Sequence, residues 1–481
     1  MKIKIIGIDD SLILKEFAVV NQGFFDTWEF VDCEADLEFN PHLSTVKNKT
    51  SRNDKYDYLR RYLTFLEQEF NQQQAWGLLN GMRPNKLIHS MKKRHFTDME
   101  IFTKIQERYL VRDEKINLLL NVANHQLKVI PDLYQLEKEV SIYIGIPFCP
   151  TKCTYCTFAA YAYEPHKKWV EPFLTSLLNE IEIIGDYLNA NNIRVTSIYL
   201  GGGTPTMLNV QDIESTLQSI SKYIIRRNPV REITVEAGRP DTLTKQKLEL
   251  LKAFNVNRIS INPQSFNQET LDQIGRYHSV AEVIDKFKLA KKVGLENVNM
   301  DLIVGLPNEE KEELSQSLAQ IKKWQPESLT VHMLALKRKS EIAHDNKRSA
   351  VAQKNVLIEM AKMTYDFAEQ EGYIPYYLYR QKSISGNMEN IGYAKSGYEC
   401  LYNIVMMEEA QTVLGLGVGA SSKFLIGESV HNPKDLRTYI EGYEHYAKKK
   451  LELLELSIKM KAQSFTYHPP VSINTHLKYG I

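Results

Sequence analysis

From Ser141 onward, short runs of apolar and β-branched residues alternate with longer stretches in which apolar residues recur every three or four positions. The short runs are typical of buried strands and the longer stretches of amphipathic helices, so the alternation predicts successive β/α units. The predicted strands are Ser141–Ile146, Ser197–Leu200, Glu232–Glu236, Arg258–Asn262, Asn297–Ile303 and Leu329–Leu334. The predicted helices are Lys167–Asn189, Val210–Ile225, Lys245–Ala253, Val280–Val293 and Glu309–Lys323. Six such units predict an α/β fold with a partial (β/α)6 barrel over residues 136–345, whose ligands would lie at the carboxyl ends of the strands.

The segments on either side of the barrel are predicted to be separate domains, which suits a chain of 481 residues. Residues 1–135 open with the strand-like run MKIKIIG and continue with helical patterns at Lys55–Phe70 and Phe96–Leu120. They are predicted to form a small N-terminal α/β domain, for which the sequence indicates no role. Residues 346–481 carry mostly helical patterns, including Ala350–Glu371, and are predicted to form a mainly helical C-terminal domain.

One stretch of the N-terminal segment is basic, with Arg83, Lys86, Lys92, Lys93 and Arg94 placed around apolar positions. It could be a docking face for a partner or for nucleic acid, or the solvated flank of a helix. The solvated flank is favoured, because the aromatic residues that single-strand binding uses are not interleaved with the charges.

The bulk composition points away from large charged partners. Hydrophobic residues make up 43% of the chain and charged residues 25%, and the net charge is +1, so there is no broad electrostatic case for nucleic acid or for a membrane surface. The first apolar run is too short for a secretory signal, and no stretch is long and apolar enough to span a bilayer. We therefore expect a soluble, cytoplasmic protein with no nucleic-acid partner and no membrane span.

Three of the five cysteines stand close together directly after the first predicted strand. Cys149, Cys153 and Cys156 form a Cys-x3-Cys-x2-Cys array, whereas Cys33 and Cys400 lie far away in the sequence and are predicted to be plain buried thiols. A closed zinc or iron–sulfur site needs four ligands. Three thiolates on a four-iron cube leave one iron open to a small molecule that offers an amine and a carboxylate, and S-adenosylmethionine meets that demand.

A zinc knuckle is the alternative for this loop, with a distant histidine such as His166 as the fourth ligand. It is disfavoured because common zinc patterns combine a Cys-x2–4-Cys unit with a second ligand pair, and none is visible. Disulfides are disfavoured by the odd number of cysteines and by their crowding, which suit a reducing compartment.

Polar and glycine residues follow four further predicted strands. The run Gly201-Gly202-Gly203-Thr204 comes after the second strand, where glycines let the main chain approach a ligand closely. Each single polar residue at such a place is usually a surface or capping residue, but several at successive strand ends favour a site. These residues are Glu236, Gln264, Arg276 and Asp301.

The motifs YIGIPFCPTKCTYCTF and GGGTPT resemble those of the radical S-adenosylmethionine (SAM) superfamily. The wider frame is most similar to the oxygen-independent coproporphyrinogen III oxidase-like family, of the HemZ type and related to HemN and HemW. The resemblance implies a [4Fe-4S] cluster on Cys149, Cys153 and Cys156. It implies S-adenosyl-L-methionine contacts at Tyr143, Tyr155, Gly202, Gly203, Thr204, Glu236, Gln264, Arg276, Asp301 and Ala335. The family's last contact is an isoleucine, and because Ser421 stands in its place we leave Ser421 out of the predicted site.

The resemblance also implies a reaction, although it identifies no catalytic residue in this chain. A 5′-deoxyadenosyl radical would drive the oxygen-independent oxidative decarboxylation of coproporphyrinogen III to protoporphyrinogen IX, with an electron donor such as flavodoxin or ferredoxin. A tetrapyrrole substrate needs an apolar wall and a few cations for its propionates. The residues that could supply them are Tyr376, Tyr377, Tyr379, Arg380, Lys337 and Arg338.

Phe158 departs from the pattern of the oxidases, which carry a further cysteine at that position. Phenylalanine there also occurs in the haem-chaperone relatives, so a haem-binding chaperone of the HemW kind is one alternative. The chain lacks the His-Asn-x-x-Tyr-Trp sequence of those chaperones, and its N-terminal extension is foreign to them. A radical SAM methyltransferase that acts on a tetrapyrrole is the other alternative.

Overall fold

The computed structural model describes residues 52–225, 229–335, 353–381 and 388–464, together with residue 340 and short pieces of residues 2–39. Its centre is an 11-stranded sheet with the order β12-β13-β11-β10-β9-β8-β7-β4-β14-β15-β16. The six strands of the predicted β/α units are neighbours in this sheet, and every pair among them is parallel. They are β4 (Val140–Ile146), β7 (Val195–Gly202), β8 (Glu232–Glu236), β9 (Arg258–Ser260), β10 (Asn297–Val304) and β11 (Ser328–Met333).

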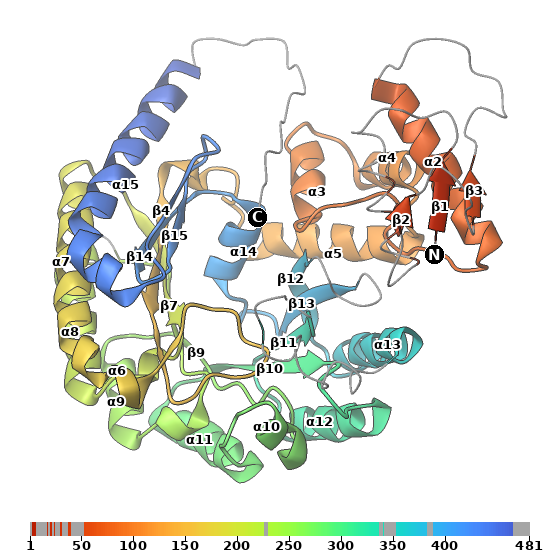
Figure 1. Ribbon diagram of the computed structural model, residues 1–481. Helices are drawn as coiled ribbons and strands as arrows, with labels where there is room; N and C mark the ends of the chain where they lie inside the picture. The colour runs from red at the N-terminus through yellow and green to blue at the C-terminus, as the bar shows by residue number, and fades with distance from the viewer. Residues whose placement is uncertain are drawn as a thin grey trace.

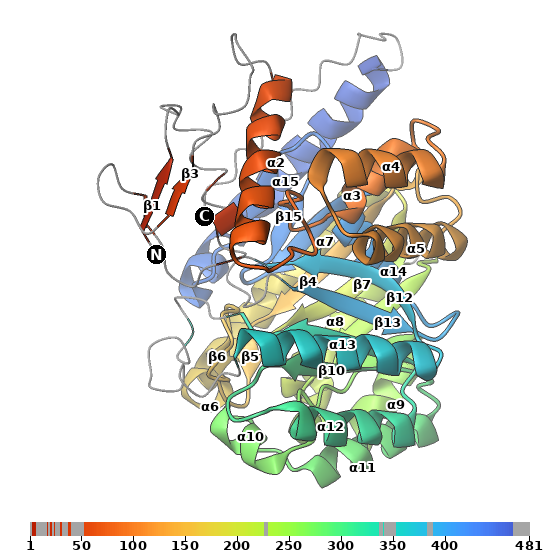
Figure 2. The same ribbon diagram turned by 90° about the vertical axis from the view of Figure 1, so that its right-hand side faces the viewer.

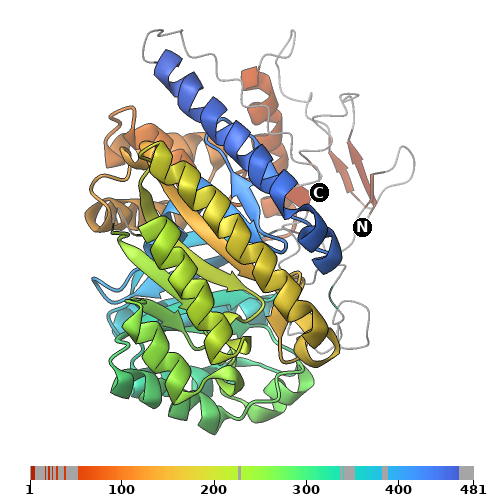
Figure 3. The same cartoon turned by 90° about the vertical axis from the view of Figure 1, so that its left-hand side faces the viewer.

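Helices cover the outer face of the curved sheet (Figures 1 and 3). Nearly every residue of the six strands is buried, on both faces of the sheet, which accounts for their nearly continuous apolar sequences. The covering helices are α7 (Val170–Ala190), α8 (Val210–Ile220), α9 (Lys245–Ala253), α10 (Gln268–Gln273), α11 (Val280–Val293) and α12 (Lys311–Trp324). A π-helical turn at Ser221–Ile225 continues α8 to the predicted end of that helix. These elements confirm the predicted partial (β/α)6 barrel.

Residues after the sixth unit extend the sheet at both edges. The strands β13 (Glu389–Ala394) and β12 (Ile374–Arg380) add antiparallel partners beyond β11. At the other edge β14 (Thr412–Gly417) pairs in parallel with β4 and is followed by β15 (Ser421–Lys423) and β16 (Ser429–His431). Among the described strands β12 and β16 remain the two ends of the sheet, so the barrel stays open.

The C-terminal helices are α13 (Lys354–Gln370), α14 (Leu401–Glu408) and α15 (Leu436–Ser464), and helical residues outnumber strand residues in this part of the chain. The long helix α15 packs along α7 (Figure 3). One buried carboxylate joins these elements: Glu180 on α7 pairs with Lys450 and accepts hydrogen bonds from the Tyr439 hydroxyl and the Gly417 N–H, both at 2.8 Å. No described helix has the length and apolar character needed to cross a membrane.

In the described part of the N-terminal segment, a small sheet lies beside several helices (Figure 2). The strands β1 (Lys2–Ile5), β2 (Glu29–Phe30) and β3 (Leu37–Phe39) pair in parallel. The helices are α2 (Arg52–Glu69), α3 (Asn85–Lys92), α4 (Asp98–Tyr109) and α5 (Asp113–Val129). The helical pattern predicted over Phe96–Leu120 is divided between α4 and α5, because Leu110 takes a left-handed conformation with φ 53° and lets α5 fold back onto α4.

The N-terminal segment is packed against the barrel. Helix α5 lies on β12, and α3 contacts α14, which fills the space between the two edges of the sheet (Figure 1). Trp76 is 1% exposed, and its indole N–H donates to Glu389 on β13 at 2.8 Å. The segment therefore covers an edge strand that would otherwise expose its polar backbone groups.

Candidate functional site

The three-cysteine loop begins after the carboxyl end of β4, and a pair of short strands joins its two ends. Two short strands, β5 (Phe148–Cys149) and β6 (Tyr161–Ala162), pair in parallel, and the helix α6 (Tyr163–His166) follows. At its far side the loop is tied to the segment after α10: the Thr154 N–H donates to the Ile274 carbonyl at 3.1 Å, and the Thr151 hydroxyl donates to the Gly275 carbonyl at 2.9 Å. The loop is thus held over one end of the sheet.

The thiols of this loop lie close enough to influence one another. Burial, with the neighbouring thiols Cys153 and Cys156 adding to it, raises the pKa of Cys149 to about 11. Burial and Cys153 likewise raise the pKa of Cys156. Three thiolates in one place repel each other and need a compensating cation, which a metal centre provides. The donor set therefore fits a metal centre.

Within the described ranges, no three His, Cys, Asp or Glu side chains are placed to hold one metal ion. His166 Nδ1 donates a hydrogen bond to the Ala162 carbonyl at 2.8 Å, so the imidazole ring is held against the start of α6. Cys400 is fully buried, and its thiol donates to Glu232 at 3.3 Å, which confirms the predicted plain thiol. Cys33 lies outside the described residues.

The glycine run after β7 lies directly against the cysteine loop. Thr204 Oγ1 is 3.5 Å from Cys149 Sγ, and the Thr204 N–H donates to the Phe148 carbonyl at 2.7 Å. Gly202 has φ 107°, a conformation that side chains rarely adopt. A Cβ on Gly203 would come within 2.7 Å of the Phe148 carbonyl oxygen. This close packing against the Phe148 main chain requires glycine at position 203.

Glu236, at the carboxyl end of β8, faces a group of tyrosines inside the barrel. The Tyr199 hydroxyl donates to its carboxylate at 2.5 Å. The rings of Tyr143, Tyr199 and Tyr402 are stacked with centroids 4.7 to 6.2 Å apart. Removal from water, which outweighs the Tyr199 hydrogen bond, raises the pKa of Glu236 to about 7, and the negative charge of Asp301 adds to the rise. This carboxyl group is poised to change charge near neutral pH.

Arg276 joins the cysteine loop to the ends of two strands. Arg276 is 5% exposed, and its guanidinium lies 3.3 Å from the Tyr155 hydroxyl and donates to the carbonyls of Gly238 at 2.6 Å and Asn262 at 2.7 Å. Gln264 takes φ 68° and bridges to β10, where its N–H donates to the Asp301 carbonyl at 2.9 Å. Both predicted site residues therefore stand where several strands and the loop meet.

Asp301 on β10 is surrounded by donors. Burial opposes its charge, but His332, Asn299 and Thr330 outweigh burial and lower its pKa. Asn299 donates to it at 2.7 Å, and His332 Nε2 lies 3.6 Å away. The His332 Nδ1 is in turn 3.1 Å from the Tyr379 hydroxyl on β12. Ala335 is half-buried just after β11.

Sequence reasoning missed three residues of this interior: His332, Tyr199 and Tyr402. His332 is the one ionisable residue within the apolar strand β11, and that was a usable signal. Tyr402 comes from α14, far along the chain, and no local pattern could place it beside β4 and β7.

The predicted substrate contacts do not lie together in the structure. Tyr377 and Tyr379 are stacked on β12 with centroids 6.5 Å apart, and Tyr376 is fully buried. Arg380 instead faces the N-terminal segment, where its guanidinium lies 4.7 Å from the Trp76 ring and donates to the Leu79 carbonyl. Lys337 and Arg338 lie outside the described residues. Ser421, which we left out of the predicted site, has its hydroxyl oxygen 2.8 Å from His431 Nδ1 on the edge strand β16.

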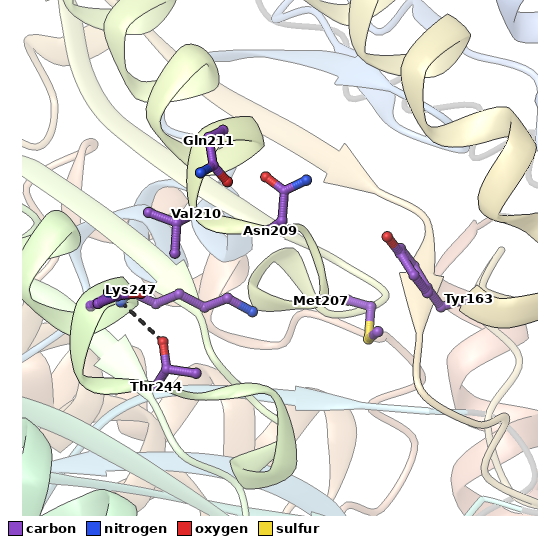
Figure 4. A pocket seen from close by; sticks show the side chains of 8 residues that line it. Tyr163, Met207, Asn209, Val210, Gln211, Thr244 and Lys247 are labelled. Atoms are coloured by element: carbon purple, nitrogen blue, oxygen red, sulfur yellow. Dashed lines mark hydrogen bonds between the residues drawn. The ribbon is translucent and has the colours of Figure 1, made fainter.

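A separate open pocket of about 600 Å³ lies where α8 and α9 begin (Figure 4). Tyr163, Met207 and Lys247 line it, and Lys247 Nζ donates to the Thr206 and Thr242 carbonyls at 2.6 and 3.0 Å. None of the predicted cofactor residues lines this pocket.

Comparison with known proteins adds independent findings. Residues 143–321 match the model of the radical SAM superfamily. The chain is 45% identical over 399 residues to the oxygen-independent coproporphyrinogen-III oxidase-like protein HemZ of Bacillus subtilis, and the match covers 82% of this chain and 80% of that protein. It is 30% identical over 287 residues to the heme chaperone HemW of Escherichia coli, covering 59% of this chain and 70% of HemW.

The solved structure of coproporphyrinogen III oxidase (HemN) from Escherichia coli superposes with a TM-score of 0.53 at 23% identity, over 68% of this chain and 73% of that one. This likeness confirms the fold. The superfamily match gives the chain a [4Fe-4S] cluster and S-adenosyl-L-methionine as cofactors, as the resemblance predicted. The chain belongs to the radical SAM superfamily and, within it, to the oxygen-independent coproporphyrinogen III oxidase-like family, of the HemZ type and related to HemN and HemW.

Proposed function

We propose that the protein decarboxylates coproporphyrinogen III oxidatively, without oxygen, to protoporphyrinogen IX in haem biosynthesis. The similarity to HemZ over most of both chains supports this reaction. The observation that carries it is the convergence of the cysteine loop, the glycine run and Glu236 at the end of a barrel whose interior is lined with tyrosines.

In this proposal Cys149, Cys153 and Cys156 hold the cluster. Gly202, Gly203 and Thr204 pack against the loop and would receive the amino end of S-adenosylmethionine. The remaining contacts would be Tyr143, Tyr155, Glu236, Gln264, Arg276, Asp301 and Ala335. Arg276 fixes the loop relative to β8 and β9, and ionised Glu236 would accept hydrogen bonds from ribose hydroxyls.

The bound cofactors supply one kind of chemistry: reductive cleavage of S-adenosylmethionine into methionine and a 5′-deoxyadenosyl radical. A propionate side chain of the substrate then loses a hydrogen atom, carbon dioxide and one electron, which passes to a one-electron acceptor, and a vinyl group remains. Two rounds complete the product. Each round consumes one electron from a donor such as flavodoxin or ferredoxin. The buried tyrosines would keep water away from the reacting groups.

Product analysis of the reconstituted protein tests the proposal. Under anaerobic conditions with a reductant and coproporphyrinogen III, mass spectrometry should detect 5′-deoxyadenosine and protoporphyrinogen IX. The Cys153→Ala variant should lose the cluster absorption and both products while its circular dichroism stays the same. Reconstituted wild-type protein that cleaves S-adenosylmethionine but leaves coproporphyrinogen III intact would contradict the reaction, and a methylated tetrapyrrole would point to a methyltransferase.

A haem chaperone is the second candidate, and Phe158 favours it. This side chain is 70% exposed on the cysteine loop, where a flat hydrophobic ligand could cover it. The similarity to HemW of Escherichia coli supports the same candidate. Stoichiometric, tight haem binding without any decarboxylation, measured by absorption titration, would select this function.

A further inference from the structure

Three cations from two distant parts of the chain lie near one carboxylate, and two of them pair with it. We call Arg83, Lys86 and Lys423 the Arg83 cluster. Arg83 and Lys86 both pair with Glu409, at the end of α14. Lys423 on β15 is the third member, and burial, with Arg83 and Lys86 nearby, lowers its pKa to about 8. Three cations near one carboxylate leave an excess of positive charge at neutral pH.

The neighbouring acidic residue does little to cancel this excess. Burial raises the pKa of Glu408 to about 7, so its carboxyl group is partly protonated at neutral pH. His89, 4.0 Å from Glu408, has a pKa lowered by burial to about 4 and is uncharged. The Arg83 cluster is therefore an electropositive place that can accept further anionic groups.

One face of α14 connects the Arg83 cluster with the barrel interior. Tyr402 and Met406 are four residues apart and share a face of the helix, and Glu409 caps the end of the helix in a left-handed conformation. Tyr402 stacks on Tyr199, which donates to Glu236. Met406 lies at the other end, with its sulfur 3.8 Å from the Arg83 guanidinium. The buried Tyr402 and the half-buried Met406 thus form an apolar row along α14 that runs from the tyrosines toward the cations.

This order of groups matches the chemistry of a flat macrocycle with carboxylates on its rim. Stacked tyrosines and a methionine suit the apolar ring, and a guanidinium suits a carboxylate because it can donate two parallel hydrogen bonds. We propose that the Arg83 cluster binds propionate carboxylates of the tetrapyrrole that are not being decarboxylated. The N-terminal segment thereby becomes part of the substrate site. This inference rests on the proposed function in one respect: the class of substrate, a tetrapyrrole, is taken from it.

The competing explanation is structural: Arg83 and Lys86 fasten the N-terminal segment to α14 through Glu409 and bind nothing else. The two explanations differ for Glu409 and Lys423. If the Arg83 cluster binds substrate, the Glu409 carboxylate competes with the substrate's carboxylates, and Glu409→Gln strengthens binding. If Glu409 only holds the N-terminal segment on α14, Glu409→Gln lowers the stability of the protein and does not improve substrate binding.

The test is a fluorescence titration of the full, reconstituted protein with coproporphyrin III and, in parallel, with its tetramethyl ester, which has the same ring without charges. Arg83→Gln and Lys423→Gln should each weaken binding of the acid about tenfold, the size of one hydrogen bond to a charged group, and leave the ester unchanged. Glu409→Gln should bind the acid several-fold more tightly. The control Lys362→Gln, which removes an exposed ion pair on α13, should change neither.

Wild-type protein that binds acid and ester equally, or Arg83→Gln and Lys423→Gln variants that bind the acid normally, would overturn the inference. Lys423→Gln keeps the inference testable if Arg83→Gln unfolds, since Lys423 is not one of the two cations paired with Glu409. Binding is measured without turnover. A protein that shows the expected binding pattern but forms no protoporphyrinogen IX would contradict the proposed reaction and support the Arg83 cluster as a carboxylate site.

Discussion

Replacing Tyr199 with phenylalanine should change the pH at which the protein binds S-adenosylmethionine. The Tyr199 hydroxyl donates to Glu236 at 2.5 Å in a site where burial already raises the pKa of that carboxyl group to about 7. A hydrogen bond to a charged group contributes about 1.5–3 kcal/mol, and its loss disfavours the ionised form. The pKa of Glu236 should therefore rise by a further 1–2 pH units, roughly.

Binding of S-adenosylmethionine should depend on whether Glu236 is ionised, because its carboxyl group is proposed to accept hydrogen bonds from the ribose hydroxyls. The ionised carboxylate is the stronger acceptor, so wild-type affinity should increase as the pH rises through about 7. In Tyr199→Phe the same increase should occur at a pH higher by about 1–2 units. Anaerobic equilibrium dialysis of labelled S-adenosylmethionine across this range measures both midpoints.

Tyr402→Phe is the matched control, because Tyr402 belongs to the same stack and its ring is retained. Its binding midpoint should stay with that of the wild type. If Tyr199→Phe and wild type share one midpoint, Glu236 is not the titrating acceptor and the reasoning is refuted.

The pH dependence of the free energy of unfolding is a second check on the raised pKa of Glu236. Because folding raises the pKa of Glu236, the folded state binds more protons than the unfolded state between the two pKa values, and stability should fall as the pH rises through this window.

Three further predictions concern packing. Gly203→Ala should destabilise the protein by about 1–3 kcal/mol in urea unfolding and abolish S-adenosylmethionine binding, because its Cβ would meet the Phe148 carbonyl at 2.7 Å, whereas Gly81→Ala, with open space around it, should do neither. Trp76→Ala should cost about 3–5 kcal/mol and make the N-terminal segment sensitive to limited proteolysis; unchanged cleavage would argue against its anchoring role. Lys450→Met should cost about 3–5 kcal/mol, since Glu180 would stay buried without its cation, and a thermal midpoint equal to wild type would contradict this.

The barrel units could be predicted because their signals are local. The helix over Val280–Val293 begins with a capping box from Ser279 and Glu282 and ends at Gly294 in a left-handed conformation, so its bounds are written in adjacent residues. The Phe96–Leu120 pattern misled because the turn at Leu110 has no glycine or proline to mark it. The strand β12, with its three tyrosines, was not expected, since its place depends on pairing with β13.

The candidate site shows the same division. The cysteines and the glycine run could be found from spacing alone, since both belong to short continuous segments. The tyrosine stack and the Arg83 cluster could not, because their members come from α3, α14, β4, β7 and β15 and meet only in the folded chain. Arg380 had a suitable charge, but its side chain is taken up by the N-terminal segment.

The position of β14 bears on when the cofactor can be installed. The strand that leads into the cysteine loop, β4, has β7 as one neighbour, and its other neighbour, β14, follows all six barrel strands along the chain. During synthesis, one flank of β4 therefore stays bare until β14 has been made. We expect the cysteine loop to be ready for iron and sulfide only after β14 has paired with β4.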